Sequence, residues 1–99
     1  MEVRIQGIHF DVSEKLAAFI NKKAERLVRR YPTIDYFDAN LRVVKPETAM
    51  NKEVVVKVIV PHESEIVATK TADTFEEGID LAIEAVERQL EKVKEAGRI

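Results

Sequence analysis

Cysteine and tryptophan are absent from this sequence, and glycine and proline occur only three times each. Without cysteine the chain has no disulfide, no thiol nucleophile and no thiolate metal ligand. Gly7, Gly78 and Gly97 lie too far apart to form a glycine-rich phosphate loop. No apolar run approaches the ~18 residues of a membrane-spanning helix, and the N-terminus alternates like a strand, unlike a signal peptide. We therefore expect a cytoplasmic protein with no membrane partner, stabilised by a hydrophobic core.

Residues suited to catalysis are also scarce. His9 and His62 stand alone and far apart, near an expected strand end and in an expected turn, and Ser13 is better explained as a helix cap than as a nucleophile. Carboxylates are plentiful, but no catalytic pair stands out from those on the expected solvent faces. Metal-ligand spacing is missing as well. We expect no enzyme, no catalytic residue, no metal and no cofactor.

Apolar periodicity predicts two amphipathic helices. The first begins at an N-cap, Ser13, and continues to Tyr31, where Pro32 ends it. The second extends from about Asp73 to Ala96. Asp73 and Thr74 both suit its N-cap, each with a glutamate three residues later as in a capping box, and Gly97 is the C-terminal cap.

Alternating and valine-rich segments predict four strands, at residues 2–8, 39–45, 53–60 and 65–71, with Tyr36 and Phe37 in the loop before the second. Residues 46–52 and 61–64 are expected to form turns. The order is therefore β-α-β-β-β-α. The sequence predicts a single α+β two-layer domain over residues 1–99, with a four-stranded sheet and both helices on one face.

Charge is distributed unevenly along the chain. The net charge of −2 and the pI of about 5.7 argue against a strongly basic nucleic-acid binder. However, residues 15–30 hold six bases and one acid, whereas residues 63–80 hold six acids and one base. The distribution of charge decides where a polyanion docks, so the first helix is the candidate surface.

Two rows of bases follow the first helix. The first row is Lys22, Arg26 and Arg29, which lie within about 60° of one another at helical spacing, and the second row is Lys23 and Arg30. Such rows suit contacts with a phosphate backbone. The alternative is an ordinary solvated helix face. Further bases that could extend the patch are Arg42, Lys45, Arg88, Lys92 and Lys94, although those of the last helix alternate with glutamates and could merely balance local charge.

Three segments near the C-terminus resemble one known family. They are Ala72-Asp73-Thr74-Phe75, Ile79-Asp80-Leu81-Ala82, and the stretch from Glu87 to Lys94 that contains Arg88-Gln89-Leu90. The first strand, Val3 to Gly7, and the helix from Leu16 to Tyr31 agree as well. The sequence resembles the ribosome hibernation promoting factors, a family that includes the ribosome-associated translation inhibitor and sigma-54 modulation proteins. Where many members have a lysine, this chain has Ala85.

The resemblance implies a fold similar to a double-stranded-RNA-binding domain. It implies that the chain binds the small (30S) ribosomal subunit and its 16S rRNA in the path of messenger and transfer RNA, and thereby inhibits translation in stationary phase or stress. A ribosome modulation factor is a further candidate partner. Lys23, Arg26, Arg42, Lys45, Arg88, Lys92 and Lys94 match basic positions of the family, and together with Lys22, Arg29 and Arg30 they are the expected rRNA contacts.

A protein-interaction module is the alternative. The acidic stretch over residues 63–80 and an exposed strand at 65–71 would suit a protein partner, such as a transcription factor, or a second copy of the chain.

Overall fold

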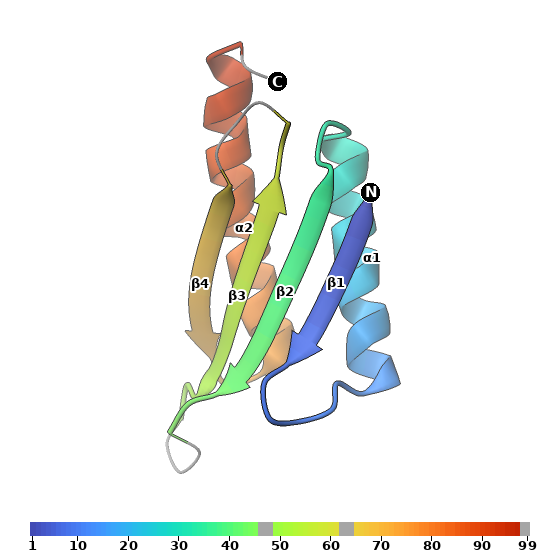
Figure 1. The fold of residues 1–99 in the computed structure, drawn as a ribbon. Helices are drawn as coiled ribbons and strands as arrows, with labels where there is room; N and C mark the ends of the chain where they lie inside the picture. Colours follow the sequence, from blue (N-terminus) through green and yellow to red (C-terminus); the bar gives the residue numbers. More distant parts are fainter. Residues whose placement is uncertain (46–48, 62–64, 98–99) are drawn as a thin grey trace.

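The expected order of elements is confirmed by the computed structural model, which describes residues 1–45, 49–61 and 65–97. The elements are β1 (Glu2–Gly7), α1 (Glu14–Arg30), β2 (Tyr36–Val43), β3 (Lys52–Ile59), β4 (Ile66–Ala72) and α2 (Phe75–Glu95). Figure 1 shows both helices on the same side of the sheet, as predicted. His62 and most of the expected hairpin at 61–64, together with part of the turn at 46–52, lie outside the described residues.

The four strands form one sheet in the order β1-β2-β3-β4. The β1–β2 pair is parallel, and the other two pairs are antiparallel. Parallel neighbours need a crossover connection, which a helix usually supplies. Because α1 makes that connection, it packs under β1 and β2, whereas α2 packs mainly on β3 and β4. The two helices consequently lie side by side beneath the sheet (Figure 1).

The core fills the space between the sheet and the helices. Alternate strand residues face the helices, and those that are fully buried include Phe37, Ala39, Leu41, Val54, Val56 and Val58. The helices contribute Ile20, Ala24 and Leu27 from α1, and Ile79, Ala82, Val86 and Leu90 from α2. This continuous core fixes the separation and the rotation of both helices, and so decides which of their polar residues meet.

The predicted start of the second strand was wrong. Tyr36 and Phe37 belong to β2, where Phe37 pairs with Val3 on one side and with Val58 on the other. Asp38 continues the alternation on the face opposite Phe37 and Ala39, but aspartate is uncommon in strands, and it made this stretch resemble a loop. In the structure Asp38 is nevertheless only 6% exposed on the face opposite the helices, where it accepts a hydrogen bond from the Asn40 side chain.

The N-cap predicted for α1 is confirmed, and of the two candidates for α2 the structure selects Thr74, since the Asp73 side chain instead accepts a hydrogen bond from the Met50 N–H. The Ser13 hydroxyl accepts a hydrogen bond from the Leu16 N–H at 3.1 Å, and the Thr74 hydroxyl accepts one from the Glu77 N–H at 3.1 Å. These bonds satisfy amides that have no partner within the helix. At the end of α2, Gly97 adopts φ +74°, the left-handed conformation that glycine allows at this position.

Gly78 sets how closely α2 approaches β3. A Cβ added at Gly78 would lie 2.7 Å from Val54 Cγ2, which is closer than two carbon atoms can pack. We expect Gly78→Val to destabilise the protein by about 1–3 kcal/mol, the usual cost of overpacking a core. In urea unfolding, the Gly78→Val, Val54→Ala double variant should lose less stability than the two single losses added together. Additive losses would contradict a steric conflict between these positions.

Candidate nucleic-acid interface

The first row, Lys22, Arg26 and Arg29, is exposed along α1. Among the residues that the structure describes, these three side chains take part in no ion pair. A phosphate can therefore bind any of the three without displacing a paired acid, although Arg26 also lines a cleft between α1 and α2. This arrangement is the one required for contact with a phosphate backbone.

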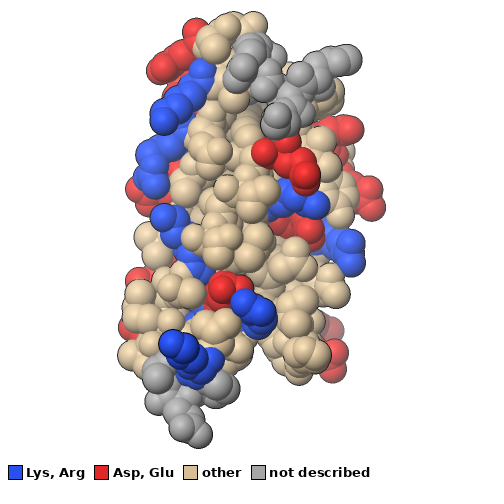
Figure 2. Space-filling view, turned by 60° about the vertical axis from the view of Figure 1, so that its left-hand side comes forward, with Lys and Arg blue, Asp and Glu red and all other residues tan. Residues whose placement is uncertain are grey.

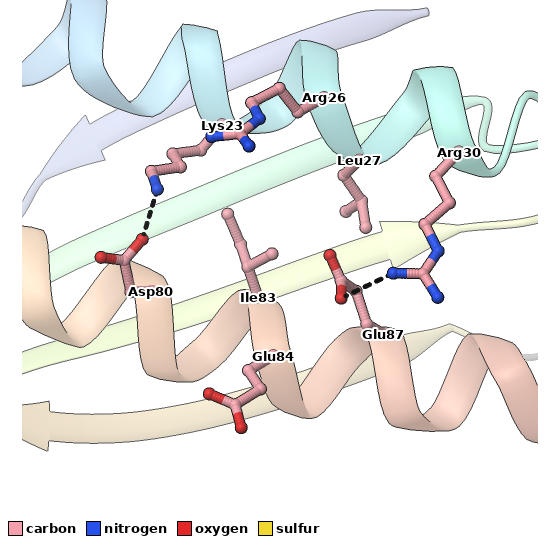
Figure 3. Close-up of a pocket in the computed structure, with 8 residues that line it drawn as sticks. All are labelled: Lys23, Arg26, Leu27, Arg30, Asp80, Ile83, Glu84 and Glu87. Atoms are coloured by element: carbon pink, nitrogen blue, oxygen red, sulfur yellow. Dashed lines mark hydrogen bonds and ion pairs between the residues drawn. The ribbon is translucent and has the colours of Figure 1, made fainter.

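The second row is paired with α2. Lys23 Nζ lies 2.9 Å from Asp80 Oδ1, and Arg30 Nη1 lies 3.5 Å from Glu87 Oε2 (Figure 3). Each of these bases also lies near the ring of an aromatic neighbour on α1, Phe19 for Lys23 and Tyr31 for Arg30. The two rows, similar in sequence, thus differ in their electrostatic surroundings.

A cleft of about 390 Å³ separates α1 from α2. Leu27 and Ile83, both part of the core, form its apolar lining. Its polar lining comes from Lys23, Arg26 and Arg30 on α1 and from Asp80, Glu84 and Glu87 on α2. Figure 3 shows Asp80 and Glu87 reaching Lys23 and Arg30 across the cleft, whereas Glu84 points away from α1. The cleft is therefore a surface of mixed charge and not a continuous basic groove.

Two smaller hollows, of about 280 and 160 Å³, lie where α1 ends. The first is lined in part by Tyr31, Arg88 and Glu91, and the second by Arg30, Tyr31 and Lys94. Of the bases predicted on the last helix, Lys94 thus approaches the second row. Arg88 is paired with Glu84 of its own helix at 3.3 Å, as the spacing predicted, and Lys92 is exposed.

Tyr31 is a buried residue at the junction of core and cleft. Its hydroxyl donates a hydrogen bond to the Glu91 carboxylate. Burial above all, and next this hydrogen bond, raise the pKa of Tyr31 to about 12. Both effects favour the neutral hydroxyl over the phenolate.

The raised pKa of Tyr31 gives a stability that depends on pH. A tyrosine in an unfolded chain has a pKa near 10, so between pH ~10 and 12 the unfolded chain loses this proton while the folded chain keeps it. The contribution to stability is fully present below pH ~10 and is lost as the pH rises toward 12. We expect Tyr31→Phe to flatten the dependence of the free energy of unfolding on pH between pH ~10 and 12, measured by urea unfolding at several pH values. An unchanged slope for Tyr31→Phe would contradict the assignment.

The remaining two predicted bases, Arg42 and Lys45, do not join the rows of bases on α1. Arg42 lies on the face of the sheet opposite the helices, where its Nη2 is 2.9 Å from Glu53 Oε1. Lys45 follows the end of β2. Contacts of Arg42 and α1 with one RNA would have to engage two faces of the molecule. The spacing of the helix bases identified their rows, but nothing in the sequence singled out Asp80 and Glu87 as their partners.

Two other kinds of site were searched for in the described part of the chain. None of its helices is both long enough and apolar enough to cross a membrane. Within the same residues, no three or more His, Asp or Glu side chains are grouped so that they could hold a metal ion.

The four-stranded sheet, its two helices and the charged cleft between them define a small α+β domain with a basic helix face. Residues 3–98 match the family described as sigma 54 modulation protein / S30EA ribosomal protein, and the chain belongs to this family. The resemblance found in the sequence is thereby confirmed.

Solved structures agree with this assignment. A ribosomal subunit interface protein from Coxiella burnetii is 26% identical, with a TM-score of 0.83 over 95% of this chain and 98% of that one. The N-terminal domain of Protein Y from Thermus thermophilus is 17% identical, with a TM-score of 0.77 over 93% of this chain and 98% of that one, and it supports the fold. No curated protein matches the sequence.

Proposed function

We propose that this chain is a ribosome hibernation factor. As one domain over residues 1–99, it binds the small ribosomal subunit through 16S rRNA in the cytoplasm, occupies the path of messenger and transfer RNA, and inhibits translation in stationary phase or stress. The observation that carries the proposal is the first row, Lys22, Arg26 and Arg29, which is exposed and unpaired within the described residues of a chain that belongs to the S30EA family. The name of the Coxiella relative, a ribosomal subunit interface protein, points to the same partner.

The mechanism is binding and steric exclusion, without catalysis. Guanidinium and ammonium groups of α1 dock on RNA phosphates, with Lys94 at the end of the cleft as an additional contact. Arginine suits this task because its planar guanidinium makes two parallel hydrogen bonds to a phosphate. The body of the domain then blocks the ligands that normally occupy the subunit.

Co-sedimentation in sucrose gradients tests the proposal. Purified protein is mixed with separated small and large subunits, and with intact ribosomes, at low and moderate salt. We expect migration with the small subunit that weakens as salt rises, because each neutralised phosphate releases counterions. A protein that stays at the top of the gradient at low salt would exclude ribosome binding by this chain.

A protein-interaction role has one structural feature in its favour. β4 is an edge strand of the described sheet, and Val67 on it is 45% exposed. The face that β4 turns to the viewer in Figure 2 is largely uncharged along its middle. However, the Gln89 side chain donates a 3.5 Å hydrogen bond to the Val67 carbonyl, which occupies part of this edge. The test is capture of a protein partner by the purified chain. Capture that persists after nuclease treatment, and that the Val67→Lys variant fails to achieve, would favour this second function.

A further inference from the structure

We propose that Asp80 and Glu87, two acids of α2, compete with RNA phosphates for the bases of α1 and so make the domain selective for RNA that presents several phosphates at once. This inference rests on the proposed function and concerns how the same surface rejects other RNA. It begins with position. The two acids are spaced at i and i+7, so they share one side of α2, and both line the cleft opposite α1 (Figure 3).

The acids already occupy the positions that phosphates would take. Asp80 holds Lys23 at 2.9 Å and Glu87 holds Arg30 at 3.5 Å. A phosphate that binds either base must replace a carboxylate, and the released carboxylate then repels it at short range. Glu84 also lines the cleft, but its carboxylate is paired with Arg88 of the same helix and not with a base of α1. A phosphate bound to Lys23 or Arg30 would lie well within ~8 Å of the displaced carboxylate, the range over which charges interact in physiological salt.

The stability of the fold does not account for these pairs. In each pair one side chain is well exposed, Asp80 at 53% and Arg30 at 60%, and the other is partly buried, Lys23 at 27% and Glu87 at 33%. Ion pairs with an exposed member contribute little to folding. A carboxylate that contributes little to stability but cancels a basic charge on a candidate RNA surface has its main effect on binding. Repulsive groups of this kind create specificity by weakening the wrong complexes more than the right one.

Selectivity follows from the difference between the two rows. An RNA whose phosphates reach only Lys23 or Arg30 gains one contact and is repelled by the carboxylate that it displaces. An RNA whose phosphates also reach Arg26 and Arg29 gains contacts that replace no carboxylate. Folded RNA that packs several backbones together meets this condition more fully than a short duplex, which presents only its own two backbones. The net charge of −2 is consistent with weak binding to RNA in general.

The test compares the wild type with an Asp80→Asn, Glu87→Gln double variant. The matched control is Glu53→Gln, Glu65→Gln, which also removes two acids from exposed ion pairs, those with Arg42 and Lys57, on the opposite face of the sheet. The probes are a short RNA duplex of arbitrary sequence and purified small subunits, each titrated over a range of salt. Circular dichroism and thermal unfolding establish that each variant is folded, and the single variants Asp80→Asn and Glu87→Gln replace the double variant if that one is not.

We expect the double variant to bind the duplex at least about 10-fold more tightly than the wild type, and small subunits less than about 3-fold more tightly. The slope of log affinity against log salt for the duplex should steepen by about one for each base released. An equal gain in the control would overturn the inference, because net charge alone would then explain the effect. An unchanged duplex affinity with normal subunit binding would also overturn it, while leaving the proposed function intact. If no form binds subunits but the double variant gains the duplex, the competition is supported and the proposed function fails.

Discussion

Replacing Arg26 and Arg29 together by glutamate is expected to lower the affinity for small ribosomal subunits by at least about 100-fold. Each arginine that binds a phosphate makes a charge-assisted hydrogen bond of roughly 1.5–3 kcal/mol, and each 1.4 kcal/mol is about a factor of ten in affinity. Both side chains are exposed and unpaired within the described residues, so the substitution breaks no ion pair in the free protein. The measurement is titration of labelled protein with purified subunits at fixed salt.

A control with the same charge change separates the α1 patch from net charge. Arg4→Glu with Lys15→Glu changes one base on the open face of the sheet and one in the first turn of α1, where an acid is favourable to the helix dipole. We expect this control to retain most of the affinity. Equal losses in both variants would mean that the first row has no special part in binding.

Replacing Phe37 by alanine is expected to destabilise the protein by about 3–5 kcal/mol, because a large buried side chain is lost and a cavity remains. Phe37 is fully buried at the centre of the sheet, between β1 and β3. Small domains are stable by only ~5–15 kcal/mol, so the loss is a large part of the total. Urea unfolding should show a lower midpoint with a similar slope.

The neighbouring residue supplies the control. Tyr36 is also an aromatic residue of β2, but it is half-buried and points to the face away from the helices. Tyr36→Ala should therefore cost clearly less than Phe37→Ala. Similar losses at the two positions would contradict the assignment of Phe37, and not Tyr36, to the core face of the strand.

Much of the fold was accessible from local patterns. Ser13 and Thr74 are capping residues followed by long amphipathic periods, and both helices begin where these residues predicted. The start of β2 was not accessible, because aspartate is uncommon in strands and only pairing with β1 and β3 on both sides makes the strand extend back to Tyr36. The strand partners are far apart in the sequence, and local propensity carries no information about them.

For the candidate site, the sequence located the bases but not their surroundings. Helical spacing places Lys22, Arg26 and Arg29 on one side of α1 whatever the rest of the chain does. The sequence also suggested that Arg42 could extend the basic surface of α1. In the structure the pleat of β2 turns Arg42 to the opposite face of the sheet, against Glu53.

The sequence by itself determined the order of elements, the two helix caps and the rows of bases, since each depends on residues only a few positions apart. The tertiary structure alone decided which row remains free. Packing on a common core brings α1 and α2 side by side and rotates Asp80 and Glu87 toward Lys23 and Arg30. These partners are more than fifty residues apart, so their pairing arises from the shared sheet beneath both helices and not from any local pattern.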